Sequence, residues 1–238
     1  MRESEQPVEL LSLETLPGHY TQLRFRVPPS LANPQPGRYC RISNGNLSGL
    51  MPIMRVKGDV LECLYRNGHE TPLPERLLDG RLTAVLQGNA WKTMPDEFHT
   101  VFLAQNEGLA SVVHAAERLH YGNLQIMLTA FLEFDDGPPF TPKPSQILLP
   151  GLPPEALACA PLLEDWGIAS RLADPDDRRM PRPGWFSGTA VRLTEIWLEN
   201  TVAGNYRLVC CGTQRFVDAV SNLADRRGLP VDTAVLPI

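Results

Sequence analysis

The chain has 238 residues, enough for one large domain or two small ones with a substantial core. Charged residues make up 21% and hydrophobic residues 43%, as in an ordinary globular protein. The net charge of −5 and the lack of any basic run argue against a protein that binds nucleic acid or an anionic membrane.

The start of the chain and its apolar segments predict neither export nor membrane insertion. Residues 1–5 contain charged side chains instead of the apolar core of a signal peptide. The longest uncharged apolar stretches are far shorter than the ~20 residues of a membrane-spanning helix. We therefore expect a cytoplasmic protein that does not contact a membrane.

The first part of the chain reads as β structure. Apolar and polar residues alternate in short segments, which Gly, Pro and Asn separate at roughly regular spacing. This pattern is typical of a small antiparallel barrel. The six expected strands span residues 8–13, 21–27, 38–42, 51–56, 59–65 and 82–86.

The pattern changes near residue 98. Residues 100–104 form a continuous apolar run, as expected for a strand that is buried on both faces. Apolar residues then recur at helical spacing over 109–119, and a strand is expected over 124–131. Two further helices, over 154–166 and 188–199, flank a strand near 168–172. This alternation of strands and helices predicts a parallel sheet.

The C-terminal segment is the clearest α/β unit. Residues 206–211 are a short apolar run, Gly212 and Thr213 form a turn, and 214–227 have helical spacing. A final strand is expected over 230–236. The turns at the carboxyl edge of such a sheet are where it binds ligands. We therefore predict a β + α/β fold, with a six-stranded antiparallel Greek-key barrel over residues 1–95 and a parallel-sheet, Rossmann-like domain over 96–238.

Several short motifs occur in an order that resembles the ferredoxin–NADP reductase superfamily. Pro36-Gly37-Arg38-Tyr39 resembles its Pro-Gly-Gln-Phe strand start, and residues 88–91 (Gly-Asn-Ala-Trp) resemble the Gly-Asn-Gly-Phe that closes its barrel. Cys211-Gly212 resembles its Cys-Gly-Pro turn. Within the superfamily, the chain looks most like the electron-transfer subunit of dihydroorotate dehydrogenase. The resemblance implies a barrel that binds FAD, a domain that binds NAD(P), and electron transfer to a partner.

The motif for the flavin differs from the family's Arg-Pro-(Ile/Leu/Tyr)-Ser. The matching residues are Met51-Pro52-Ile53-Met54, in which two thioethers replace the charged and hydroxyl ends. Arg55 comes one residue late and is expected to point to the other face of its strand. Arg41, on a neighbouring strand, is a second candidate for a compensating charge.

A second flavin motif, Gly-x-Gly-Thr, is also altered. Gly68 and Thr71 are retained, but Glu70 stands at the second glycine. A side chain there adds bulk where backbone must approach the phosphates, and its charge opposes an anion. His69 within this motif is interpreted as a solvated loop residue.

The motif for the nicotinamide nucleotide, Gly-Gly-x-Gly-x-x-Pro, is the most altered. It corresponds to residues 105–111, where Gln105, Asn106 and Glu107 precede the single remaining glycine, Gly108. Free amides at the start of the following helix still offer a site for a weaker or different ligand. By family position, the cofactor-binding residues are Pro52, Ile53, Gly68, Thr71, Gly108, Gly212 and Thr213.

Cys211 is the one catalytic position of the family that the sequence matches. The residues favour packing of a small side chain at this strand end over a redox role, and Cys210 is interpreted as a packing residue. The chain has five cysteines, with no Cys-x-x-Cys spacing, and it stops before the family's cysteine-rich segment. No iron–sulfur cluster or other metal site is expected.

Three functions remain open from the sequence. The favoured one is a reductase-like module with degenerate FAD and NAD(P) sites, which binds a protein partner or forms a homodimer. The alternative is an active FAD-dependent NAD(P)H oxidoreductase, and the third is a binder of a less charged small molecule. The Pro-rich segment 133–154 is either a stiff surface loop or a lid or partner surface, with a candidate strand over 146–149.

Overall fold

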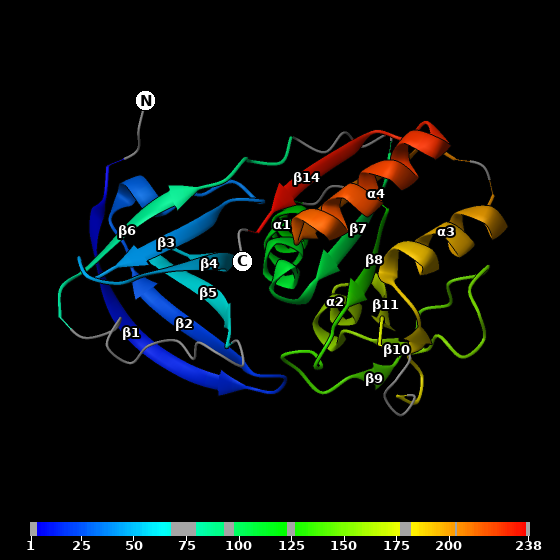
Figure 1. Cartoon of the computed structure of the whole chain (residues 1–238), viewed down its shortest axis with the longest axis horizontal. Coiled ribbons are helices and arrows are strands. Elements are labelled where there is room, and N and C mark those ends of the chain that lie inside the picture. Colours follow the sequence, from blue (N-terminus) through cyan, green and yellow to red (C-terminus); the bar gives the residue numbers. More distant parts are fainter. Residues whose placement is uncertain are drawn as a thin grey trace.

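The protein consists of a β-barrel beside a parallel sheet that helices cover on both faces (Figure 1). The structure is a computed structural model, and it describes residues 4–67, 80–92, 98–122, 127–176, 182–202 and 204–236. No helix within these ranges is both long and apolar enough to cross a membrane. The predicted position of the domain boundary, near residues 94–98, lies largely outside the described residues.

The barrel is antiparallel and closed, as predicted. Its strands pair in the order β1-β2-β5-β4-β3-β6, and alternate side chains from them fill the interior. A single 3₁₀ turn, η1 (Pro29–Leu31), follows β2. The strands are β1 (Gln6–Leu16), β2 (Tyr20–Arg26), β3 (Tyr39–Ser43), β4 (Ser48–Lys57), β5 (Val60–Arg66) and β6 (Leu82–Gln87).

The second half contains a six-stranded sheet in the order β12-β11-β8-β7-β13-β14. Every neighbouring pair in this sheet is parallel, which confirms the Rossmann-like prediction. A two-stranded antiparallel ribbon, β9 (Lys143–Pro144) and β10 (Ala158–Cys159), lies apart from it. The sheet strands are β7 (His99–Gln105), β8 (Leu128–Glu133), β11 (Ala169–Asp174), β12 (Phe186–Ser187), β13 (Tyr206–Gly212) and β14 (Val231–Val235).

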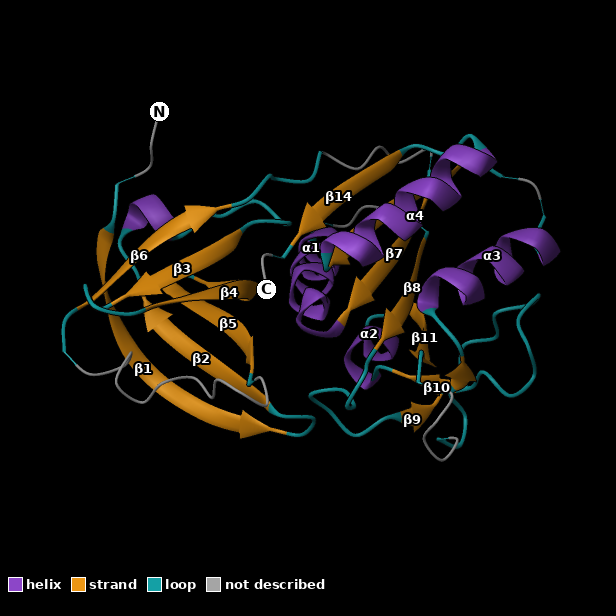
Figure 2. Cartoon of the chain, in the orientation of Figure 1, coloured by secondary structure: helices purple, strands orange, loops and turns teal. Residues whose placement is uncertain are grey.

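Helices cover the two faces of the sheet in pairs (Figure 2). The helices α3 (Ala190–Asn200) and α4 (Gln214–Arg227) share one apolar core with the strands, whereas α1 (Leu109–Tyr121) and α2 (Pro161–Asp165) share the other. The helix α4 has the predicted bounds and is capped at both ends. Thr213 caps its first turn through Oγ1, which accepts from the Phe216 amide, and Gly228 ends it with a left-handed φ of 64°.

The barrel and the sheet share one hydrophobic core. Tyr20, Leu64 and Trp91 of the barrel half pack in the same cluster as Phe102 of β7 and the apolar side chains of α1. The helix α1 is buried at every position from 109 to 116, because the sheet lies on one side of it and the barrel on the other. The two halves therefore meet through apolar packing as well as through polar contacts.

Two predicted elements differ from the structure in their bounds. The expected helix over 154–166 is wrong in its first half, where the Ala158 amide donates to the carbonyl of Gly184 and Cys159 pairs with β9, so that only α2 is helical. The expected strand over 124–131 begins later, at Leu128, and residues 123–126 lie outside the described part of the chain.

The segment 133–154 is a packed, irregular connection. Residues 146–149 form no strand. Arg171 of β11 holds the segment by donating to Ser145 Oγ at 2.7 Å and to the carbonyl of Ile147 at 2.8 Å. Phe140 packs against the core beside α1, whereas Leu149 packs against the core beside α3. The proline-rich connection thus passes from one face of the sheet to the other.

Candidate functional site

The candidate site lies where the strand order of the sheet reverses. The strands β7 and β13 are parallel neighbours, but the chain leaves β7 through α1 toward β8 and leaves β13 through α4 toward β14. The two connecting turns therefore diverge from adjacent strand ends. One is η3 (Asn106–Gly108), and the other is Gly212 with Thr213. The carboxyl edge at such a reversal is the usual ligand site of open α/β sheets.

The side chain of Gln105 links the two turns. Its Nε2 donates to Glu133 Oε1 at 2.9 Å, and its Oε1 accepts from the hydroxyl of Thr213 at 2.7 Å. The second oxygen of Glu133 accepts from the amide of Ala190, at the start of α3, at 2.9 Å. Burial raises the pKa of Glu133. The end of β7, the end of β8 and the starts of α3 and α4 are therefore connected by side chains.

Asn106 makes a second such connection. Its φ of 50° lies in the left-handed region, where Asn is better tolerated than most residues. Its Nδ2 donates to Asp135 Oδ2 at 2.6 Å, and its Oδ1 accepts from the Asp135 amide at 3.1 Å. Asn106 is 3% exposed. Both of its polar groups are thus used within the protein.

Gly108 and Gly212 are required by close packing. A Cβ on Gly108 would lie 2.2 Å from the carbonyl oxygen of Cys211, because the start of α1 crosses directly over the end of β13. A Cβ on Gly212 would lie 2.7 Å from the ring of Phe216 and 2.9 Å from Cβ of Gln105. Each glycine therefore permits a contact between elements of the sheet domain itself.

The charges around η3 are mainly negative. Burial raises the pKa of Glu107, an effect that Arg66 partly offsets and Asp135 reinforces. Arg66, at the end of β5, pairs with Asp136 at 2.8 Å and with Asp135 at 3.4 Å. Tyr20 is fully buried beside these groups, and its hydroxyl has no hydrogen-bond partner among the described residues. Arg66, whose charge acts on Glu107, is thus already engaged by two carboxylates.

Cys210 and Cys211 pack on opposite faces of β13, as their adjacency predicts. Cys210 belongs to the core beside α3 and α4, and Cys211 belongs to the core beside α1. Cys211 is fully buried, and its thiol lies 3.5 Å from the hydroxyl of Ser111. Burial raises the pKa of Cys211 to about 12. The thiol form is therefore the stable one at neutral pH, which does not suit a nucleophile.

The predicted flavin motif is divided between two sides of the barrel wall. Met51 and Ile53 point into the barrel core with no exposed area, so that Ile53 offers only its backbone to a ligand. Pro52 is buried as well. Met54 lies outside, in the core shared with α1. Of the motif, Met54 presents its side chain to the junction between the two halves, and Pro52, which pairs with Tyr39, lies on the outer face of the barrel wall.

Arg55 does not reverse its direction relative to Met54, contrary to expectation. A β-bulge interrupts the pairing of β4 with β5 between Ile53 and Arg55, and this extra residue resets the alternation. Arg55 Nε lies 3.3 Å from Glu117 of α1, and its guanidinium stacks over the ring of Trp166 at 5.5 Å. Arg55 thus joins the barrel to α1.

The structure brings together only part of the predicted site. Gly108, Cys211, Gly212 and Thr213 meet at the strand reversal, whereas Pro52 and Ile53 belong to the barrel wall. Gly68 and Thr71 lie outside the described residues. Arg41 is 3.4 Å from Glu5 on the outside of the barrel.

Sequence reasoning missed two features of this site. It did not foresee the bonds of Gln105 to Glu133 and of Asn106 to Asp135, or the ion pairs of Arg66. The acidic residues that follow β8 were an available signal, because the ends of neighbouring parallel strands meet at one edge.

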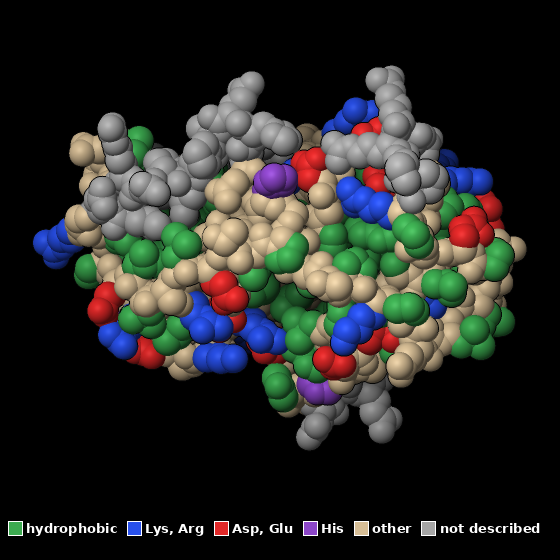
Figure 3. All heavy atoms as spheres, turned by 90° about the horizontal axis from the view of Figure 1, so that it is seen from below, with side chains coloured by type: hydrophobic (Ala, Val, Ile, Leu, Met, Phe, Trp, Pro, Cys, Tyr) green, Lys and Arg blue, Asp and Glu red, His purple; other side chains and the backbone are tan. Residues whose placement is uncertain are grey.

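The molecule is hollowed between its two halves on the face that Figure 3 shows, with hydrophobic side chains in the hollow and charges of both signs at its rim.

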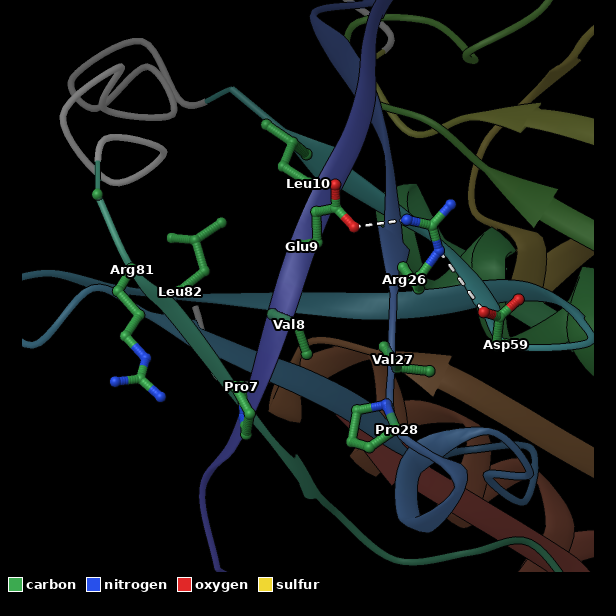
Figure 4. Close-up of a pocket in the computed structure, with 11 residues that line it drawn as sticks. Pro7, Val8, Glu9, Leu10, Arg26, Val27, Pro28, Asp59, Arg81 and Leu82 are labelled. Atoms are coloured by element: carbon green, nitrogen blue, oxygen red, sulfur yellow. Dashed lines mark hydrogen bonds and ion pairs between the residues drawn. The ribbon is translucent and has the colours of Figure 1, made fainter.

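A separate open groove of about 780 Å³ lies on the barrel, where residues 7–10, 26–28, 59 and 80–82 line it. In this groove Arg26 lies between Glu9, at 2.6 Å, and Asp59, at 3.6 Å (Figure 4). No cluster of His, Cys, Asp and Glu within the described ranges has the arrangement of a metal site.

The sequence matches no family model and no curated protein. The fold matches solved structures over nearly the whole chain. A cytochrome P450 reductase from Amycolatopsis superposes with a TM-score of 0.74 and 15% identity over 98% of this chain and 69% of that one. A ferredoxin reductase of a carbazole 1,9a-dioxygenase gives a TM-score of 0.71 and 13% identity over 98% and 69%. The flavohem-like FAD/NAD-binding domain of a nitric oxide dioxygenase from Vibrio cholerae gives 0.70 and 13% over 99% of both chains. At these identities the likeness shows a shared fold.

Proposed function

We propose that the protein keeps the reductase fold without binding FAD or NAD(P) in the reductase manner, and that it acts by contact with a protein partner or a second copy of itself. The observation that carries the proposal is the Gln105 side chain, whose hydrogen bonds to Glu133 and Thr213 cross the strand reversal. A pyrophosphate must approach the backbone at this place.

The chemistry of the turn does not fit a pyrophosphate. Asn106 and Glu107 add side chains where the family has glycine or open space. The carbonyl oxygen of Cys211 packs directly against Gly108, in the space that a Cβ would take. Arg66 would have to leave two carboxylates to meet a phosphate. Each charged hydrogen bond that is lost costs about 1.5–3 kcal/mol, so two or three such losses weaken binding by roughly a thousandfold or more.

The barrel side supports the same proposal. Met54 fills the junction with an apolar thioether, and Arg55 is committed to Glu117 and Trp166. A thioether donates no hydrogen bond to a flavin or a phosphate. Neither residue therefore replaces the lost arginine and serine of the family motif.

A partner protein is proposed because of the kind of protein that shares the fold. Two of the similar structures are a reductase of a cytochrome P450 and a ferredoxin reductase of a dioxygenase. A surface that once met such a partner can persist after the cofactor sites are lost, since fold and site change separately. We do not expect iron in the purified protein, and metal analysis checks this.

Calorimetric titration with NADH and NADPH tests the proposal. We expect dissociation constants weaker than about 1 mM. Glu107→Gly is expected to strengthen binding, because it removes bulk and negative charge at the turn. Glu155→Gly, an exposed acid elsewhere, is the matched control and should change nothing. Micromolar binding to the unmodified protein would contradict the proposal.

The alternative is an active FAD-dependent NAD(P)H oxidoreductase. The observation in its favour is that both halves of the fold and the strand reversal between them are retained. If this alternative is right, the purified protein is yellow and reduces ferricyanide with NADH. If the proposed function is right, it does neither.

A further inference from the structure

A small cavity lies between the barrel and the edge strand β14, on the side of the sheet away from β8. Its volume is about 210 Å³. The barrel contributes Gly37 and Tyr39 at the start of β3, and Gly88 and Asn89 after β6. The sheet contributes residues 233–235. In Figure 1, β14 points from the sheet toward the barrel. None of the residues that line this cavity is charged.

The wall formed by β14 presents backbone groups that have no partner among the described residues. The Leu208 amide donates to the carbonyl of Pro230, and the Leu236 amide donates to that of Gly212. In a parallel ladder, alternate residues bond to the neighbouring strand, so the even-numbered residues of β14 face β13. The N–H and C=O groups of Thr233 and Val235 therefore point to the open edge, where no described strand pairs with them. Partly covered groups of this kind need water or a ligand.

The opposite wall consists of backbone and one aromatic ring. Gly37 and Gly88 have φ values of 88° and 81°, which only glycine adopts readily. A Cβ on Gly88 would lie 2.7 Å from the ring of Tyr39, so the ring stands directly against this turn. The cavity thus has a flat aromatic surface beside an edge of alternating acceptors and donors.

We propose that this cavity binds an uncharged planar heterocycle of one or two rings, with a hydrogen-bond donor and an acceptor side by side on one edge. The carbonyl of Thr233 would accept from the donor, the amide of Val235 would donate to the acceptor, and Tyr39 would contact the ring. The volume is below the roughly 300–1,000 Å³ of sites for larger ligands, which excludes a whole dinucleotide.

Amide NMR of the full chain tests the proposal with two matched pairs of probes. 2-Pyridone and quinazolin-4-one carry the donor and the acceptor, whereas their N-methyl derivatives keep the shape and lose the donor. We expect the unmethylated compounds to shift the amide signals of Gly88, Thr233 and Val235, with dissociation constants of about 1 mM or tighter. The N-methyl compounds should bind at least tenfold more weakly. The absence of saturable shifts with either unmethylated compound would overturn the proposal.

Proline substitutions on the open edge supply the matched variants. Val235→Pro removes the donor that faces the cavity, and the ladder with β13 is preserved because this N–H does not take part in it. Val231→Pro removes an N–H on the same edge but outside the cavity. We expect Val235→Pro to lose binding at least tenfold and Val231→Pro to retain it.

Two further measurements distinguish loss of ligand binding from failure to fold, and the proposed ligand from a flavin. Asn89→Trp changes an exposed residue, so folding should persist, and its ring should fill the cavity and abolish binding even if Val235→Pro does not fold. Equal binding by Asn89→Trp and the unmodified protein would overturn the proposal. So would FAD shifting the same three amides with higher affinity than both heterocycles, because the cavity would then be part of a flavin site.

Discussion

Glu107 and His114 are two titratable residues, and burial destabilises the charged form of each. Glu107 lies at η3 beside Asp135, and one of its carboxylate oxygens has no hydrogen-bond partner in the described part of the chain. His114 of α1 is 1% exposed, and neither of its ring nitrogens has a partner there. The titration of each residue should therefore make the free energy of unfolding depend on pH in a specific way.

Glu107→Gln is expected to stabilise the protein at neutral pH. Burial raises the pKa of Glu107, so the folded state holds its proton at a pH where the unfolded state has released it. Stability therefore falls as pH rises from about 4.5 through the folded pKa. The gain from Glu107→Gln should be largest at pH 7 and should shrink toward pH 4. Urea unfolding at several pH values measures it, and a gain that does not depend on pH would contradict the explanation.

His114→Leu is expected to remove part of the acid sensitivity. Burial, with a smaller effect from Arg118, lowers the pKa of His114 to about 4 from the usual 6.5. The unfolded state thus takes up a proton that the folded state refuses, and stability falls as pH decreases from 6.5 to about 4. The loss is about 3 kcal/mol. Unfolding of His114→Leu should lack this slope, whereas the exposed control His120→Gln should keep it.

The contact between the start of α1 and the end of β13 sets the geometry of the site at the scale of elements. The carbonyl of Cys211 occupies the place that a Cβ on Gly108 would need, so the two elements touch through their backbones. Gly108, which the resemblance assigns to a nicotinamide motif, thus has a structural role in packing that does not involve a nucleotide.

Gly108→Ala is expected to destabilise the protein by about 3 kcal/mol or more, because a backbone oxygen cannot move aside as a flexible side chain can. The control is Gly204→Ala, whose added Cβ would meet the Tyr206 ring at an ordinary 3.4 Å. Its effect should stay below about 1 kcal/mol. Denaturant unfolding compares the two, and equal effects would show that the close contact relaxes.

Strands and helices were predictable from the sequence in segments where the apolar residues follow a single periodicity. The alternating segments gave the six barrel strands, and the apolar spacing over 214–227 gave α4. The prediction failed over 154–166, where the bonds between Ala158 and Gly184 override local helical spacing. The bulge at Met54 has no signature in the sequence, and it changes where Arg55 points.

The site was less predictable than the fold, for a physical reason. The sequence places Gln105, Asn106 and Glu107 at one turn, but the partners of these side chains come from the ends of other strands. Glu133 ends β8, Asp135 follows it, and Arg66 ends β5 in the other half. Such contacts depend on how the strands are ordered and how the barrel docks, which neither periodicity nor spacing specifies.

The molecule as a whole is expected to unfold as one cooperative unit, because the barrel and the sheet share an apolar core through Leu64, Trp91 and α1. Calorimetry should show a single transition. Leu64→Ala, in the barrel, should destabilise by about 2–5 kcal/mol and lower that transition without splitting it. Two separate transitions would mean that the halves are independent.

The absorption spectrum of the purified protein tests most directly whether the molecule binds flavin. After incubation with excess FAD and gel filtration, we expect no flavin band between 370 and 450 nm above about a tenth of one equivalent, because weakly bound flavin dissociates on the column. A protein that leaves the column yellow, with one FAD per chain, would show that the flavin site works.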